Sequence, residues 1–263
     1  MNAYTTLKVG IMDSVAIISL NRPHIHNAFN EVMIAELITC FDSLQEREDV
    51  RVIILRGEGK SFCAGADLNW MRDVAKYTYQ ENYHESLQLS KCFYAIYSSP
   101  KPVIAVVHGA AIGGANGLLA ACDIACCDND TVFSLSEVKI GIVPACISPY
   151  VIKRVGEYGA RELMLTGRRI NGPEAQSFGL VNRSLPSGEI DAYVKGVIAL
   201  LMSSGPKAVA QCKVLIDQVA NKISMDEALT YTAKMIADIR ASEEGQEGMA
   251  AFLGKRSPNW INK

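Results

Sequence analysis

The stretch that decides the fold is VIAVVHGAAIGGANGLLAACDIACCDNDTVFSLSE, residues 103–137. Its apolar, β-branched start, Val103–Val107, predicts a buried strand, and the small residues Ala115–Cys122 predict the start of a helix. Between them lie Gly113 and Gly114. The first turn of a helix has backbone N–H groups without internal partners and a partial positive charge, so a glycine entry lets an anionic oxygen come close. The stretch therefore predicts either an oxyanion-binding turn or a tight connection between two buried elements.

Two nucleotide-binding motifs do not fit the chain. The dinucleotide pattern G-x-G-x-x-G needs a spacing that the glycines of this turn, at positions 109, 113, 114 and 117, do not have. Gly59-Lys60-Ser61 is similar to the end of a phosphate loop, but the glycine required five residues before Gly59 is replaced by Ile54. The turn is therefore not interpreted as a nucleotide site.

The composition is that of an ordinary globular protein. The 263 residues are 49% hydrophobic and 21% charged, with a net charge of −2 and no run of five like charges. We therefore expect neither nucleic acid nor an anionic membrane as a partner. The N-terminal MNAYTTLKVG has no basic segment followed by an apolar core, and no apolar run is long enough to span a membrane, so a cytoplasmic location is expected.

Eight cysteines are present, most of them in apolar segments such as LAACDIACCD. A free cysteine in such a segment behaves as a small hydrophobic residue, so buried, reduced thiols are expected. The chain has neither paired C-x-x-C nor H-E-x-x-H spacing, and His24-Ile25-His26 is interpreted as a loop. We therefore predict no metal site.

Strands and helices alternate in the first half of the chain. The predicted elements are a hairpin over 7–21 that turns at Asp13-Ser14, a helix capped by Asn30, a strand over 51–56, a helix over 79–98 and the strand that begins at Val103. This alternation indicates a mostly parallel sheet, in which ligands lie beyond the carboxyl ends of the strands. Two loops of small residues, 57–67 and 109–114, follow two such strands.

Helix signals dominate after Glu137. Caps are predicted at Asn171, Ser204 and Ser224, and apolar stripes follow the last two. No linker, repeat or low-complexity tract separates this part of the chain from the rest. We predict a core with the active site over 1–200 and a C-terminal helical oligomerisation region over 201–263.

The chemistry is sought in the two loops, because no G-x-S-x-G nucleophile elbow is present. Two backbone N–H donors that converge on one carbonyl oxygen would stabilise an enolate or oxyanion. Glu137 follows the second loop, and a carboxylate beside the carbon next to that carbonyl could move a proton. The alternative for Glu137 is a surface or ion-paired glutamate.

Five segments together resemble a known family. They are SFCAGADL (61–68), KPVIAVVHGAAIGGANGLLAACDIA (101–125), FSLSEVKIGIVP (133–144), LTGRRINGPEAQSFGLVN (165–182) and FLGKRSPNW (252–260). In this order they resemble the crotonase superfamily of enoyl-CoA hydratases and isomerases. The resemblance implies an α/β fold, a crotonase-like spiral of β-β-α units with a C-terminal helical region. It also implies a homotrimer or dimer of trimers and an acyl-CoA thioester substrate, with no cofactor beyond the coenzyme A of the substrate.

The resemblance also implies roles for individual residues. The oxyanion hole would be the N–H groups of Ala66 and Gly114, and Glu137 matches the family's second catalytic glutamate, which transfers a proton at the substrate carbon. The substrate-binding residues implied by the matched loops and by the C-terminal tail are Ala64, Asp67, Leu68, Asn69, Gly113, Asn116, Gly117, Phe252 and Lys255.

One position departs from the two-glutamate hydratases. Their first catalytic acid stands three residues after the oxyanion glycine, where this chain has Gly117, so Asn116 or a backbone carbonyl would have to orient water. The residues GGANGL and SEVKIGIVPACISPY resemble bacterial methylglutaconyl-CoA and carboxygeranoyl-CoA hydratases of leucine and acyclic-terpene degradation. The first hypothesis is therefore hydration of an enoyl-CoA, branched or carboxylated. Isomerisation by one glutamate and a non-catalytic acyl-CoA- or RNA-binding protein are the alternatives.

Overall fold

The computed structural model describes residues 4–261, which form two compact units. The first unit contains residues up to 99 and residues 103–193, and the second contains residues 100–102 and those from 194 onward. The predicted boundary at 200/201 falls within helix α7, Ile190–Ser203. The predicted oligomerisation role of the C-terminal region stays a prediction. In the described part of the chain, no helix is both long and apolar enough to cross a membrane.

The first unit is built on a six-stranded sheet with the order β1-β2-β3-β4-β6-β8. Its strands are β1 (Leu7–Met12), β2 (Val15–Leu20), β3 (Val52–Gly57), β4 (Val103–Val107), β6 (Ile124–Asp128) and β8 (Arg183–Leu185). Only β1 and β2 pair antiparallel, and every other neighbouring pair is parallel. The mostly parallel sheet predicted from the alternation of strands and helices is thereby confirmed.

The hairpin and the helix caps follow from local sequence. Asp13 and Ser14 both have positive φ, at 50° and 62°, which is the backbone of a tight two-residue turn. The Asn30 side chain accepts a hydrogen bond of 3.1 Å from Met33 N–H, as expected of a helix cap. The predicted caps at Asn171 and Ser224 are confirmed as capping boxes, whereas Gly205 occupies the cap position that was predicted for Ser204.

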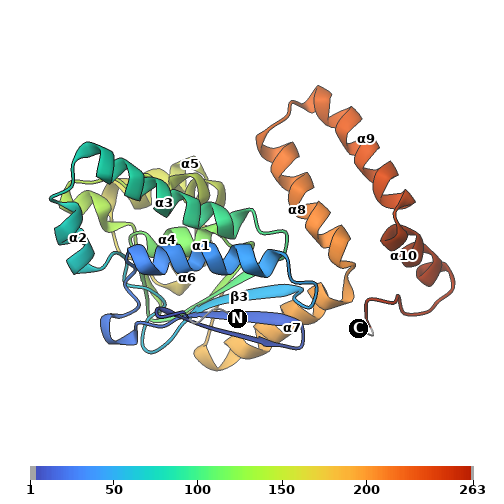
Figure 1. Ribbon diagram of the computed structural model, residues 1–263, viewed down its shortest axis with the longest axis horizontal. Helices are drawn as coiled ribbons and strands as arrows, with labels where there is room; N and C mark the ends of the chain where they lie inside the picture. Colours follow the sequence, from blue (N-terminus) through green and yellow to red (C-terminus); the bar gives the residue numbers. More distant parts are fainter. Residues whose placement is uncertain (1–3, 262–263) are drawn as a thin grey trace. The chain divides into compact units, whose positions relative to one another are not determined.

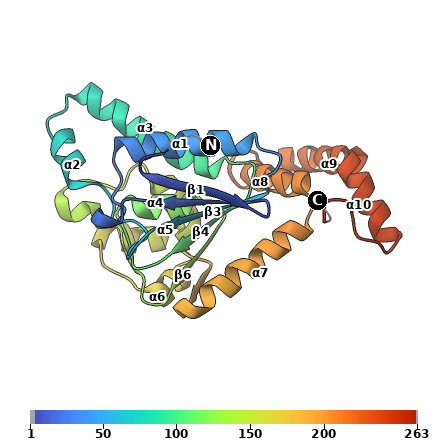
Figure 2. The same ribbon diagram turned by 60° about the horizontal axis from the view of Figure 1, so that its bottom comes forward.

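Helices surround the sheet of the first unit. They are α1 (Glu31–Gln45), α2 (Leu68–Val74), α3 (Tyr79–Tyr97), α4 (Ala115–Ala121), α5 (Ser148–Thr166) and α6 (Gly172–Ser177). Helices α1 and α3 lie side by side along one face of the sheet (Figures 1 and 2). Each places its apolar stripe in the core, with Phe41 on α1 and Phe93 on α3 almost wholly buried.

A second, two-stranded sheet was not predicted from the sequence. It pairs β5 (Ala110–Ile112) with β7 (Val132–Ser134) in parallel. The predicted turn between strand and helix therefore contains a short strand of its own. This small sheet carries the backbone of the candidate site.

The second unit contains most of α7 and the helices α8 (Pro206–Asn221), α9 (Met225–Ala241) and α10 (Glu243–Leu253). Helix α9 runs back beside α8 (Figure 1). The Glu244 carboxylate accepts hydrogen bonds from the N–H groups of Lys207 and Ala208, over 3.0 and 2.7 Å. This contact satisfies two free N–H groups at the first turn of α8 and holds α10 against it.

All eight cysteines are free thiols. Six are buried, which confirms the expectation for them, while Cys146 is half-buried and Cys212 is exposed.

Candidate active site

Three backbone segments run parallel at the candidate site. Cys63 N–H donates to the Ala110 carbonyl over 3.0 Å, and the Cys63 carbonyl accepts from Ile112 N–H over 3.2 Å. On the other side of β5, Ala111 pairs with Phe133 of β7 in the small sheet. Cys63, Ala111 and Phe133 therefore lie at one level across three segments that travel in the same direction.

Ala66, Gly114 and Glu137 lie three, three and four residues beyond that level. Parallel segments that start at one level end at the same edge, so the register brings the ends of the three segments together. Groups that are 71 residues apart in the chain, from Ala66 to Glu137, are thereby brought to the same edge.

The N–H of Ala66 points away from the segment that holds this loop. Phe29 N–H donates to the Gly65 carbonyl over 2.8 Å, and the Phe29 carbonyl accepts from Asp67 N–H over 2.9 Å. The C=O and N–H of a trans peptide point in opposite directions. Because the Gly65 carbonyl faces Phe29, the Ala66 N–H of the same peptide faces the opposite side.

The N–H of Gly114 is oriented in a similar way. The Gly113 carbonyl accepts from the backbone N–H of Asn116 over 3.0 Å and from its side-chain Nδ2 over 2.9 Å. The Gly114 N–H belongs to the same peptide as that carbonyl and points away from Asn116. Within residues 4–261, neither Ala66 N–H nor Gly114 N–H has a hydrogen-bond acceptor. Two unsatisfied donors at one edge form an arrangement able to hold an oxyanion.

Glu137 places its carboxylate beside this turn. It lies in a 3₁₀ turn, Ser136–Ile140, that directly follows β7. A Cβ added to Gly113 would lie 3.3 Å from Glu137 Oε1, so the carboxylate touches the residue before the proposed donor Gly114. Gly113 also has a φ of +55°, and glycine suits this position on both counts.

The Glu137 carboxylate is electrostatically unusual. Its Oε2 is buried and has no hydrogen-bond partner among the described residues. Burial raises the pKa of the Glu137 carboxyl, and a hydrogen bond from its own backbone N–H offsets only part of this increase. A half-buried carboxylate that has one unpartnered oxygen and a raised pKa is typical of a general acid or base. The alternative of an exposed or ion-paired glutamate does not describe this residue.

Gly117 faces a filled space. A Cβ at this position would lie 2.4 Å from Ile147 Cγ2 and 2.8 Å from two ring carbons of Phe93. The Phe93 ring packs edge to face on Tyr150, with ring centroids 6.1 Å apart. The position that the resemblance assigns to a first catalytic glutamate therefore has no room for a side chain.

The Asn116 side chain contacts backbone carbonyls in the protein interior. It is fully buried, and its Nδ2 lies within hydrogen-bonding distance of the carbonyls of Ala111, Gly113 and Ser134, at 3.2, 2.9 and 3.0 Å. These contacts tie β5, the glycine turn and β7 together. The donors of Asn116 are thus occupied by backbone, and its Oδ1, buried without a partner among the described residues, is what remains for water.

The residues around Ala66 divide into engaged and exposed groups. The Asp67 carboxylate caps α2 by accepting from Asn69 N–H over 2.8 Å, and it pairs with Arg22 Nη2 at 2.8 Å. Burial alone would raise the pKa of Asp67, but these hydrogen bonds and the guanidinium hold it below its usual value. Leu68 and Asn69 are exposed, and Ala64 is half-buried, so these three are open to a ligand.

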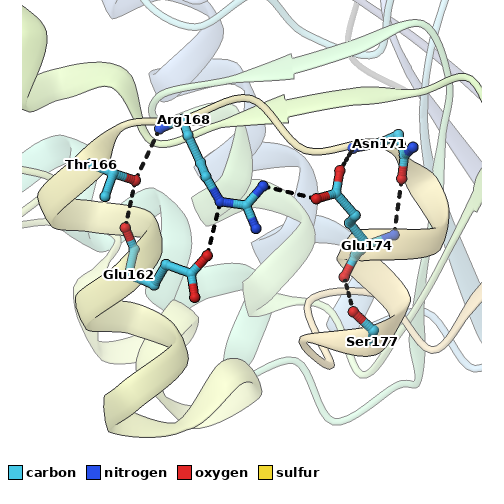
Figure 3. Close-up of polar contacts among 6 residues, drawn as sticks. All are labelled: Glu162, Thr166, Arg168, Asn171, Glu174 and Ser177. Carbon is cyan, nitrogen blue, oxygen red and sulfur yellow. Dashed lines mark hydrogen bonds and ion pairs between the residues drawn. The ribbon is translucent and has the colours of Figure 1, made fainter.

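A network of polar contacts around Arg168 joins the end of α5 to the start of α6 (Figure 3). Arg168 donates to Glu162 at the end of α5 and to Glu174 in the first turn of α6, over 2.9 and 2.8 Å. Between these partners, the Gly167 carbonyl accepts from Ser134 Oγ over 3.0 Å. The strand that leads to Glu137 is thereby held from a second side.

Phe252 and Lys255 belong to the second unit. Phe252 is 83% exposed and Lys255 adopts a positive φ of 51°. Their predicted contact with coenzyme A stays a prediction.

Sequence reasoning missed two features of the site. Phe29, which binds the Ala66 segment, follows no recognisable motif and could be found only through the pairing that brings residues 29 and 66 together. A cavity of about 670 Å³ between α1 and α3 was also not predicted, and its lining residues, among them Glu31, Tyr77 and His84, include none of the predicted site residues. We place the chemistry at the unpaired N–H groups of Ala66 and Gly114, because the Glu137 carboxylate lies against the neighbouring Gly113.

Comparison with known proteins identifies the family. The family model described as enoyl-CoA hydratase/isomerase matches residues 10–263. The chain belongs to this family. A crystal structure of an enoyl-CoA hydratase from Shewanella pealeana has a TM-score of 0.94 and 39% identity, and the match covers 97% of this chain and 96% of that chain. The resemblance to the crotonase superfamily and the expected crotonase-like α/β fold are thereby confirmed.

Relatives of this family include both hydratases and isomerases. The crotonyl-CoA hydratase of Syntrophomonas wolfei is 31% identical over an alignment of 263 positions, which covers 99% of this chain and 100% of the relative. The peroxisomal Delta(3,5)-Delta(2,4)-dienoyl-CoA isomerase of Arabidopsis thaliana is 34% identical over 274 residues, which cover 99% of this chain and 98% of the relative.

Proposed function

We propose that this family member hydrates 2-enoyl-CoA thioesters, with the thioester oxygen held by the N–H groups of Ala66 and Gly114. The observation that carries the proposal is the pair of unsatisfied donors next to the half-buried Glu137 carboxylate, whose Oε2 is buried without a hydrogen-bond partner among the described residues. Hydratases at 31–39% identity over nearly the whole chain support it.

The reaction follows from these groups. As the oxygen of water bonds to C3, the carbonyl oxygen takes up negative charge and C2 becomes the carbon of an enolate. Two fixed N–H donors stabilise that charge, and the loss of one such donor in other enzymes costs roughly 2.7–4 kcal/mol. Glu137 accepts the proton that water loses and returns a proton to C2. The raised pKa of Glu137 suits both steps, because the ionised and protonated forms are then closer in energy at neutral pH.

Double-bond isomerisation is the second candidate, and the packing at Gly117 favours it. Isomerisation needs one group that removes a proton from one carbon and returns it to another, which a single carboxylate can do. Ile147 and Phe93 fill the space of a second carboxylate, so the usual pair of acids for holding water is absent. A dienoyl-CoA isomerase among the relatives is consistent with this alternative.

A turnover assay in ¹⁸O-labelled water separates the two functions. Hydration places solvent oxygen in the product of a 2-enoyl thioester, whereas isomerisation converts a 3-enoyl to a 2-enoyl thioester without oxygen uptake. We expect ¹⁸O in a 3-hydroxyacyl product. Product without ¹⁸O from both substrates would select the isomerase, and tight coenzyme A binding without turnover would select the non-catalytic alternative.

Substitution of Glu137 tests its role. We expect Glu137→Gln to lower kcat by about 10²–10⁴-fold, the usual contribution of a positioned acid or base. Glu157→Gln is the matched control, because Glu157 is an exposed surface residue that pairs with Arg161 four residues along the same helix. Wild-type turnover by Glu137→Gln on every thioester tried would contradict the assignment.

The acyl group and the assembly are part of the same proposal. We propose a branched or carboxylated acyl group, as in methylglutaconyl-CoA, and an acyl-CoA panel with straight, branched and dicarboxylic members tests it through kcat/KM.

We also propose a cytoplasmic homotrimer or dimer of trimers in which Ala64, Asn69, Phe252 and Lys255 contact coenzyme A. Light scattering coupled to gel filtration distinguishes the monomer, trimer and hexamer.

A further inference from the structure

Phe29 contacts the backbone of both proposed donors. Its N–H and carbonyl bind Gly65 and Asp67, the residues on either side of Ala66, over 2.8 and 2.9 Å. These two bonds fix the peptide that carries the Ala66 N–H. Phe29 itself is 4% exposed, so it is held by the core.

The Phe29 ring reaches the other donor. A Cβ built on Gly114 would lie 2.5 Å from Phe29 Cζ and 3.0 Å from Cε1, which places the ring edge directly against the Gly114 backbone. One residue thus joins Ala66 through its main chain and Gly114 through its side chain. The distance between the two donors is spanned by a single rigid aromatic group.

The ring is supported from behind. The ring of Trp70 on α2 packs edge to face on Phe29, with centroids 5.7 Å apart. The Trp70 Nε1–H donates to the carboxylate of Glu85 on α3. Helix α3 therefore limits the movement of Trp70, and Trp70 limits the movement of the Phe29 ring away from Gly114.

We propose that Phe29 is a positioning residue that sets the spacing of the Ala66 and Gly114 N–H groups. This inference rests on the proposed function of those groups as an oxyanion hole. A shorter side chain leaves Gly114 free to shift toward the vacated space. A longer one pushes Gly114 away, because Cζ is the ring atom nearest to it. Both changes weaken the hold on the enolate while leaving coenzyme A contacts in place.

The test compares Phe29→Leu and Phe29→Tyr with Phe41→Leu. Phe41 is an equally buried phenylalanine on α1, which begins at Glu31, and it lies about 15 Å beyond the start of that helix at 1.5 Å per residue. Removal of one oxyanion donor lowers rates by about 10²–10³-fold, so a displaced donor is expected to lower kcat by about 10–100-fold. KM is expected to change less than about 3-fold, and Phe41→Leu to keep kcat within about 2-fold, as befits a substitution away from the donors.

A spectroscopic readout separates this inference from the proposed reaction. Acetoacetyl-CoA loses a proton from C2 to give an enolate that absorbs in the near ultraviolet, and oxyanion donors increase the ionised fraction of the bound thioester. We expect a lower ionised fraction in both Phe29 variants and an unchanged fraction in Phe41→Leu. This measurement remains valid if no enoyl-CoA is turned over. Equal enolate ionisation and kcat in wild type and the Phe29 variants would overturn the proposal. An equal loss in Phe29→Leu and Phe41→Leu would also overturn it, by showing a general loss of packing.

Discussion

Replacement of Gly117 by alanine is expected to destabilise the first unit, although alanine is the better helix former. Gly117 lies within α4, where alanine would gain about 1 kcal/mol of helix propensity over glycine. Its Cβ would, however, lie 2.4 Å from Ile147 Cγ2 and 2.8 Å from two atoms of the Phe93 ring. Extra atoms in a packed core cost typically 1–3 kcal/mol, and more when several neighbours must move.

Because both Ile147 and Phe93 must move, we take the packing cost as about 2–3 kcal/mol, so the net effect on the free energy of unfolding is a loss of about 1–2 kcal/mol. For a chain of this size, that corresponds to a fall in Tm of about 2–8 °C. Thermal and urea unfolding of Gly117→Ala measure it. Gly196→Ala is the matched control, since Gly196 lies within α7 with nothing within 4 Å of its added Cβ, and this variant is expected to be as stable as wild type or more so.

The same contacts predict the outcome of an attempt to restore the second carboxylate. Gly117→Glu is expected to destabilise the chain more than Gly117→Ala and not to raise hydration, because Ile147 and Phe93 occupy the place of the new side chain. Ile147→Ala removes the Cγ2 atom that the new Cβ would meet. In a double-mutant cycle, Gly117→Ala should therefore lower the free energy of unfolding less in the Ile147→Ala background than in wild type. A Gly117→Ala variant as stable as Gly196→Ala would refute the conclusion that the position is filled.

Three further expectations concern stability and thiol access. Burial raises the pKa of Glu137 in the folded chain above its usual 4.5. As the pH rises above 4.5, the group ionises first in the unfolded chain, and the folded state loses stability until its own pKa is passed. Glu137→Gln should therefore unfold at a higher temperature than wild type at neutral pH, and this difference should vanish below pH 4.5. Arg154 donates to the carbonyls of Ala120 and Cys122 at the end of α4, over 3.1 and 2.5 Å. Arg154→Met removes both hydrogen bonds and should lower the free energy of unfolding by about 1–3 kcal/mol, measured as a lower urea midpoint. A thiol reagent should label Cys212 first and Cys63, whose pKa burial raises to about 12, only after unfolding; fast native labelling of Cys63 would contradict its burial.

The sequence by itself determined the local structure and the family. The β-branched run at Val103, the Asp13-Ser14 turn and the Asn30 cap each depend on neighbours within a few residues, and the structure confirms all three. The five family segments lie in the expected order along nearly the whole chain, and the family match confirms what they indicated. Local propensity and motif order are properties that a linear sequence carries without reference to packing.

The tertiary structure alone decided how the site is oriented. Directions of the Ala66 and Gly114 N–H groups follow from hydrogen bonds made by Phe29 and Asn116 to the adjoining carbonyls, and the first of these joins residues 36 positions apart. The partial burial of Glu137, and hence its raised pKa, depends on contacts with the segment around Gly113. Gly117 could be recognised from the sequence as a missing acid, but only the packing of Ile147 and Phe93 shows that the space is closed. Contacts between distant residues have no local signature, because they arise when the chain is folded and its core is filled.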